Sequence, residues 1–111
     1  MAIISDEYFR EMHNKLKDYT IVLIKPTPKR NDAGADAIIF EHARKNLAIS
    51  EEGLASIICP VFGGNNLSGV YIFNVSVNEV QRIMDNDPAV KAGIFIYEIY
   101  PCKGFPGASL A

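Results

Sequence analysis

The sequence predicts an α+β domain in which four strands and two helices follow the order β-α-β-β-α-β, with one extra helix in front. Its 111 residues, 49% of them hydrophobic, are enough for one core and leave little room for a second. Apolar residues recur at helical spacing in three segments, and four other short segments are rich in β-branched and aromatic residues. Turn and capping residues separate these segments.

The extra helix is expected over residues 6–17. Ser5 fits the N-cap position, and the two acidic residues after it stand where the helix dipole favours negative charge. The apolar residues Phe9, Met12 and Leu16 form only a narrow stripe along this helix. Residues 19–25 follow as a strand, which the prolines just beyond it are expected to end.

The next helix is expected over residues 36–50, after a polar turn. Its apolar face is predicted to consist of Ile39, Phe40, Ala43 and Leu47. Two strands should come next, over residues 54–62 and 68–75, because both segments are rich in apolar and β-branched residues. The connection Gly63-Gly64-Asn65-Asn66 between them predicts a turn.

The last helix has the clearest local signal in the sequence. Ser76 and Glu79 have the spacing of a capping box, and Val75 with Val80 has that of a hydrophobic staple. Asp87-Pro88 ends this helix, and residues 93–100 form the last strand. After the extra helix, the element order is the ferredoxin-like pattern. We therefore divide the chain into an N-terminal helical extension, residues 1–18, and a ferredoxin-like domain, residues 19–111.

The composition argues against several classes of partner. Eleven basic and thirteen acidic residues give a net charge of -2, so the chain has no electrostatic footprint for nucleic acid. Its apolar runs are shorter than a bilayer span and no basic cluster suggests a membrane surface. No secretory pattern is present, so a cytoplasmic location is expected. No close pair of Cys or His residues resembles a metal site, and we expect neither a metal nor another cofactor.

The predicted strands are apolar on both faces, which suggests a homodimer. In the first strand, for example, Ile21 and Leu23 alternate with Val22 and Ile24. Right-handed crossovers place both core helices on one face of such a sheet, so the other face needs a different cover. A second copy packed sheet to sheet is the favoured cover. The alternative is the N-terminal helix folded underneath, although its stripe is narrow for four strands.

Two segments resemble the YCII-related family. These are Ile39-Phe40-Glu41-His42-Ala43, with a His in the first core helix, and Asp87-Pro88-Ala89-Val90-Lys91-Ala92-Gly93, which matches the D-P-x-x-x-A-G run before the last strand of that family. The resemblance covers roughly residues 19–105. It implies a dimeric α/β barrel with a small pocket in each subunit and a His–Asp pair there, here His42 and Asp87. Relatives of this kind include a dehydrochlorinase that acts on a hydroxylated aromatic ring.

The residues themselves permit this pair. His42 borders the apolar stripe of its helix, and an imidazole titrates near neutral pH, as a general base requires. The alternative is a helix-flank His satisfied by water or a backbone carbonyl. Asp87 can cap a short following turn with Pro88 in its first position, or hydrogen-bond His42, or do both with its two oxygens. The helix of His42 begins, and that of Asp87 ends, at the same edge of the predicted sheet. His42 lies about 9 Å along its helix at roughly 1.5 Å per residue, so a contact between the two side chains is within reach.

These features lead to one main functional hypothesis and two alternatives. The main one is cofactor-independent proton transfer by His42 and Asp87, in an elimination or isomerisation of a small, aromatic or lactone-like molecule. The alternatives are a non-catalytic module that binds a small molecule and a cofactor-free monooxygenase-like enzyme. Substrate contacts are expected from Tyr71, Tyr97 and Tyr100, which alternatively belong to the core or an interface.

Overall fold

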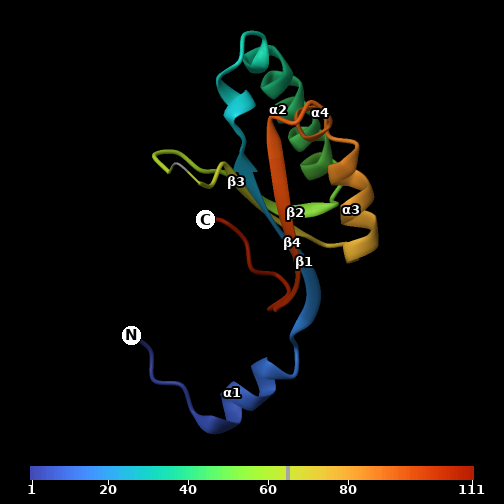
Figure 1. The fold of residues 1–111 in the computed structure, drawn as a ribbon. Helices are drawn as coiled ribbons and strands as arrows, with labels where there is room; N and C mark the ends of the chain where they lie inside the picture. Colours follow the sequence, from blue (N-terminus) through green and yellow to red (C-terminus); the bar gives the residue numbers. More distant parts are fainter. Residues whose placement is uncertain (65) are drawn as a thin grey trace.

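The computed structural model describes residues 1–64 and 66–111 and confirms the predicted α+β class. Its four strands form one antiparallel sheet in the spatial order β2-β3-β1-β4. The strands are β1 (Lys17–Pro26), β2 (Ala55–Pro60), β3 (Gly69–Phe73) and β4 (Phe95–Gly104). Three helices lie together on one side of this sheet (Figure 1). They are α2 (Ala35–Glu51), α3 (Val77–Asp85) and the short α4 (Pro88–Lys91).

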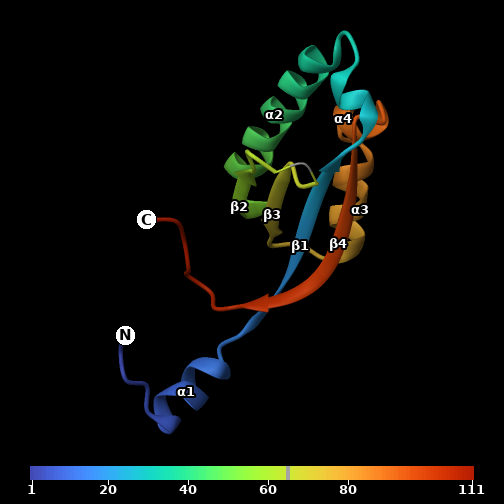
Figure 2. The same cartoon turned by 60° about the vertical axis from the view of Figure 1, so that its left-hand side comes forward.

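The N-terminal helix α1 (Asp6–His13) lies beyond the end of the sheet, where β1 and β4 extend past the other two strands (Figure 2). Ser5 caps it as predicted, since its hydroxyl accepts a hydrogen bond from the Tyr8 amide. The predicted end at residue 17 is wrong. Lys17 instead begins β1, because β4 continues to Gly104 and offers a ladder partner there. None of the described helices is long and apolar enough to cross a membrane.

The last strand also runs further than the sequence suggested. It was expected to end at residue 100, but Pro101 lies inside β4, opposite Thr20 of β1. Because β4 is an edge strand, the missing proline N–H costs no ladder bond on its outer side. The predicted turn at residues 63–66 includes Asn65, which lies outside the described residues.

The hydrophobic core lies between the sheet and the three helices. The largest hydrophobic side chains with less than 2% of their surface exposed come from β1, β3 and α3; they are Val22, Ile24, Tyr71, Phe73, Val80 and Met84. The predicted cap of α3 is present, because the Ser76 hydroxyl accepts from the Glu79 amide. This cap fixes the start of the helix and so directs Val80 and Met84 at the sheet.

The predicted apolar face of α2 is wrong at Phe40 and Leu47, whereas Ile39 packs against the core as expected. Phe40 and Leu47 each expose 62% of their surface. The side that faces the sheet instead has a repeat of three and four residues and includes Ala35, Ile38, Ile39, His42, Lys45, Asn46 and Ile49. Three polar residues interrupt this side, so hydrophobicity alone indicated a face that is rotated away from it and shares Ile39 with it. Such polar residues within a core-facing stripe are typical of a functional site.

The second face of the sheet carries no helix in the described chain, as the crossovers predicted (Figure 1). Its half-buried side chains are mostly aliphatic and include Ile21, Leu23, Ile57, Val70 and Ile72. One ion pair lies among them, between Lys25 Nζ and Glu98 Oε1 at 2.9 Å. Because α1 projects past the sheet, it does not provide the cover that was considered as an alternative to dimerisation.

Candidate functional site

His42 and Asp87 lie in direct contact beneath the sheet. The imidazole Nδ1 is 2.8 Å from the Asp87 carboxylate Oδ1, although the two residues are 45 positions apart in sequence. His42 exposes 8% of its surface and Asp87 only 1%. The contact that the helix topology suggested is therefore present and buried. Its role in catalysis remains a prediction.

The motif around Asp87 explains how the carboxylate is held. Asp87 is the N-cap of α4, and its Oδ2 accepts from the amides of Ala89 and Val90 at 2.9 and 3.2 Å. Pro88 occupies the first turn of α4. Gly93 follows the C-terminal end of this helix with φ of 73°, in the left-handed region that favours glycine. One oxygen thus fixes the helix while the other meets His42. Both roles considered for Asp87 are combined in one side chain.

The surroundings of Asp87 keep it ionised. Burial by itself would raise the pKa of this carboxyl, but the His42 hydrogen bond and charge, the Val90 amide and Lys45 together hold the pKa below its ordinary value. Lys45 lies on the same face of α2, and its ammonium donates to the Ile83 carbonyl. Burial lowers the pKa of Lys45, and the Asp87 charge opposes that change. The negative charge of the buried Asp87 carboxylate is therefore stabilised by groups on several sides.

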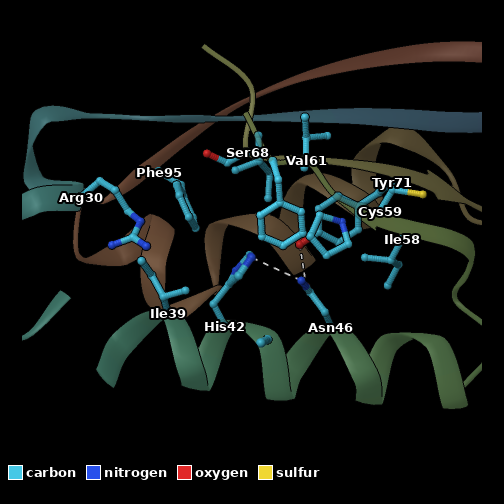
Figure 3. A pocket seen from close by; sticks show the side chains of 15 residues that line it. Arg30, Ile39, His42, Asn46, Ile58, Cys59, Val61, Ser68, Tyr71 and Phe95 are labelled. Carbon is cyan, nitrogen blue, oxygen red and sulfur yellow. Dashed lines mark hydrogen bonds between the residues drawn. The ribbon is translucent and has the colours of Figure 1, made fainter. Parts of the chain in front are cut away.

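The second ring nitrogen of His42 faces an amide. Asn46 Nδ2 is 3.2 Å from Nε2, and the Tyr71 hydroxyl donates to Asn46 Oδ1 at 2.5 Å (Figure 3). Burial and the Asp87 charge raise the pKa of Tyr71, so its hydroxyl stays a donor. Since the amide NH₂ donates to Nε2, the ring proton belongs on Nδ1, facing Asp87. Sequence reasoning missed Asn46; its only signal was its position four residues after His42.

A cavity of about 370 Å³ opens beside His42 and Asn46. Most of its wall is apolar, from α2, the ends of β2 and β3, and Phe95 (Figure 3). The lining residues are Ile24, Arg30, Ile39, His42, Ala43, Asn46, Ile58, Cys59, Pro60, Val61, Phe62, Ser68, Gly69, Tyr71 and Phe95. Phe95 also meets the imidazole edge to face, with ring centroids 5.1 Å apart. The cavity is large enough for a single substituted ring.

The three predicted tyrosines have different positions. Tyr71 lines the cavity and belongs to the Asn46 network. Tyr97 faces α3, where its hydroxyl donates to Asp85 at 2.6 Å. Tyr100 lies on the open face of the sheet and donates to Glu98 at 3.2 Å, because strand alternation turns it away from the helices. Tyr97 and Tyr100 therefore lie outside the cavity as its described residues define it.

Positive charge predominates along the described part of the cavity wall. Among the described lining residues, Arg30 is a permanent cation, His42 is titratable, and none is an Asp or Glu. Asp87 lies behind His42 rather than in the wall. Within the part of the chain that the structure describes, no three His, Cys, Asp or Glu side chains gather closely enough to hold a metal ion.

Comparison with known proteins defines the fold class. No protein-family profile matches this sequence, and no curated protein is similar to it at a significant level. A solved structure that is similar is 5-chloro-2-hydroxyhydroquinone dehydrochlorinase from Burkholderia phenoliruptrix, in complex with 2,5-dihydroxybenzoquinone. The TM-score is 0.54 at 20% sequence identity, over 74% of this chain and 90% of the other. The similarity shows the ferredoxin-like fold of dimeric α/β barrel proteins.

Proposed function

We propose that this chain is a cofactor-independent enzyme that transfers a proton on a small molecule through His42 and Asp87, in an elimination or isomerisation. One observation carries the proposal: His42 lines a cavity, while its Nδ1 contacts a buried carboxylate. A base held in one tautomer by a buried acid is the arrangement used for proton abstraction. The similar dehydrochlorinase, which was solved with a small cyclic ligand, supports a ring-sized substrate.

In this mechanism, the substrate displaces the Asn46 NH₂ from the lone pair of His42 Nε2. That lone pair then accepts a proton from an acidic C–H or O–H of the substrate. The Asp87 carboxylate stabilises the imidazolium that forms. If the proton returns to a different atom of the same molecule, the result is isomerisation. If a leaving group departs with the electron pair left behind by the proton, the result is elimination. Neither path requires an oxidant or a reductant.

Asn46 is suited to serve both protonation states of the imidazole. In the neutral state its NH₂ donates to Nε2. After proton abstraction, a half-turn of the amide about its terminal bond presents Oδ1 to the new Nε2–H and the NH₂ to the Tyr71 oxygen, which also accepts. The Asn46–Tyr71 pair then stabilises the ring both before and after the proton moves.

A solvent-exchange experiment tests the proposed proton transfer without knowledge of the complete reaction. Each member of a panel of hydroxylated aromatic compounds and lactones, with 2,5-dihydroxybenzoquinone included, is incubated with protein in D₂O and followed by ¹H NMR. We expect the wild type to exchange a carbon-bound hydrogen of at least one compound above background. His42→Gln should lower that rate by about 10²- to 10⁴-fold, because the base is lost.

His13→Gln is the matched control for this experiment, since His13 is an exposed residue of α1. The same rate in His42→Gln and wild type would reject His42 as the base. Ligand-induced shifts of cavity residues without any exchange would favour the alternative function, a module that only binds a small molecule. The mostly apolar wall of the cavity is the observation that supports that alternative.

Asn46→Leu tests the positioning role of the amide. We expect exchange to slow by about tenfold to a hundredfold, in the range caused by a misplaced catalytic group. Ligand affinity, measured by NMR titration, should change much less than the rate, since the amide acts through the imidazole. Asn78→Leu on the exposed side of α3 is the control. Equal losses of affinity and rate in Asn46→Leu would instead assign Asn46 to substrate binding.

We also propose that the chain belongs to the YCII-related family and that a second copy covers the open face of the sheet. The Asp87–Gly93 run and the His42 contact support the family assignment. The aliphatic, half-buried side chains of that face support the dimer, because monomers rarely leave an apolar area of several strands exposed.

A further inference from the structure

Arg30 is the feature of the cavity that the proposed proton transfer leaves unexplained. It belongs to the short 3-10 helix η1 (Pro28–Asn31), within the connection between β1 and α2. The Arg30 side chain is 42% exposed, yet it forms part of the cavity wall. Figure 3 shows it at one end of the cavity, with His42 between it and the Asn46–Tyr71 pair.

The backbone around Arg30 is held to the body of the protein. The Thr27 hydroxyl donates to the Gly93 carbonyl at 2.5 Å, and the Thr27 amide donates to the Ile94 carbonyl at 2.9 Å. The Arg30 amide in turn donates to the Thr27 carbonyl at 3.0 Å. These bonds join the connection to the segment that leads from α4 into β4, so the guanidinium is presented from an anchored position.

Within the part of the chain that the structure describes, the Arg30 guanidinium forms one ion pair, which leaves other donors for a ligand. Its Nη1 pairs with Asp36 Oδ1 at 3.0 Å, but the Asp36 side chain is 91% exposed and lies outside the cavity wall. An exposed pair of this kind contributes little and exchanges readily with water. A guanidinium has five N–H donors in a planar fork that matches a carboxylate. With no Asp or Glu among the described lining residues, the cavity favours an anion at this end.

We propose that Arg30 is the substrate's anion receptor and that the substrate class is a monocyclic acid with a carboxylate or an acidic enol or phenol group. The proposal rests on the proposed function, because it places the acidic oxygen on Arg30 and the reacting hydrogen over His42. The apolar wall contacts the ring between these two groups. A neutral lactone without an acidic group would give the guanidinium no anionic partner inside the cavity.

Benzoate and benzamide are suitable probes, since they share size and shape and differ in charge. Binding is measured by ¹H–¹⁵N NMR titration of the full chain near neutral pH. We expect benzoate to shift the cavity residues and to bind about tenfold or more tightly than benzamide. Arg30→Gln should weaken benzoate by about 10- to 100-fold, the effect of one charge-assisted contact, and should leave benzamide unchanged. Arg30→Lys should restore part of the benzoate affinity.

Arg44→Gln removes the same charge from the outer side of α2, where the Arg44 guanidinium lies 5.2 Å from the centre of the Phe40 ring. It should leave both affinities unchanged, which separates local contact from net charge. Equal binding of the two probes, binding of neither, or equal losses in the two Arg variants would overturn the receptor role. The titration measures binding and not proton transfer. A failure here therefore leaves the exchange experiment intact, and a failure of exchange leaves this result standing.

Discussion

Asp87→Asn is expected to lower the rate of proton transfer by about 10⁴-fold, the scale seen when an amide replaces the acid that orients a catalytic histidine. In the wild type, the carboxylate accepts from Nδ1–H, which leaves Nε2 as the basic nitrogen, hydrogen-bonded to the Asn46 NH₂ until substrate takes its place. An amide NH₂ in that position donates to Nδ1 instead. The ring proton then moves to Nε2, and the base is lost from the cavity. The rate is measured with the D₂O exchange experiment, and ¹⁵N NMR of the His42 ring reports the tautomer.

Asp87→Asn should affect stability much less than activity. The Asn side-chain oxygen can still accept from the amides of Ala89 and Val90, so the cap of α4 is kept. Asp87→Ala removes this cap and also leaves the buried His42 Nδ1–H without a partner. Together these losses amount to about 2–4 kcal/mol of the free energy of unfolding. Urea denaturation of the three proteins measures the difference. A loss of activity in Asp87→Asn that merely follows unfolding would contradict the tautomer argument.

The depressed pKa of Asp87 also predicts how stability depends on pH. The ordinary value for this carboxyl is 3.8, and the folded protein holds it lower. Above the ordinary value the stabilisation is fully present; it is lost as the pH falls from there through the lower pKa of the folded state, because the unfolded chain binds the proton first. In Asp87→Asn, this part of the fall in the free energy of unfolding at acid pH should be absent. Parallel curves for the two proteins below pH 4 would contradict the ionised state of Asp87.

The resemblance to YCII-related proteins indicated the pairing of His42 with Asp87, and local signals in the sequence were compatible with it. Asp87 stands before a proline with a glycine six residues later, a pattern that a capped single turn requires. His42 lies within a long helical segment, and the ferredoxin-like order fixes which helix ends meet. Local capping chemistry and topology together determine where the two side chains lie.

Arg30 and Asn46 were beyond such reasoning for a different reason. Arg30 lies in a connection whose course depends on bonds from Thr27 to residues 93 and 94, far along the chain. Asn46 lies on the sheet-facing side of α2, where polar residues made hydrophobic periodicity indicate a face rotated away from the sheet. Phe40 and Leu47 consequently seemed buried although they are exposed. Where a binding site takes up part of a core, its polar residues interrupt the apolar periodicity by which a core-facing helix is recognised in a sequence.

A substitution on the open face of the sheet is also expected to have a large effect, on the oligomeric state. If a second copy covers this face as proposed, Ile21→Glu should convert the dimer into monomers, with a fall in association of at least about 10²-fold. Ile21 lies on the central strand β1, opposite Ile72 of β3 on one side and Tyr100 of β4 on the other. In a sheet-to-sheet dimer, a carboxylate at this position would be buried without a partner, which costs several kcal/mol. Light scattering coupled to gel filtration measures the change, and circular dichroism verifies that the variant is folded.

Leu47→Glu distinguishes the proposed sheet interface from a second exposed apolar surface, on the outer side of α2. Leu47 and Phe40 lie on the outer side of α2, away from the sheet, and each is 62% exposed. If the open sheet face forms the dimer, Leu47→Glu stays dimeric while Ile21→Glu becomes monomeric. The reverse result would assign the interface to α2. A wild-type monomer at micromolar concentration would reject the dimer, because no second copy would then cover the sheet face. The contact between His42 and Asp87 does not depend on that outcome, since it forms within one chain.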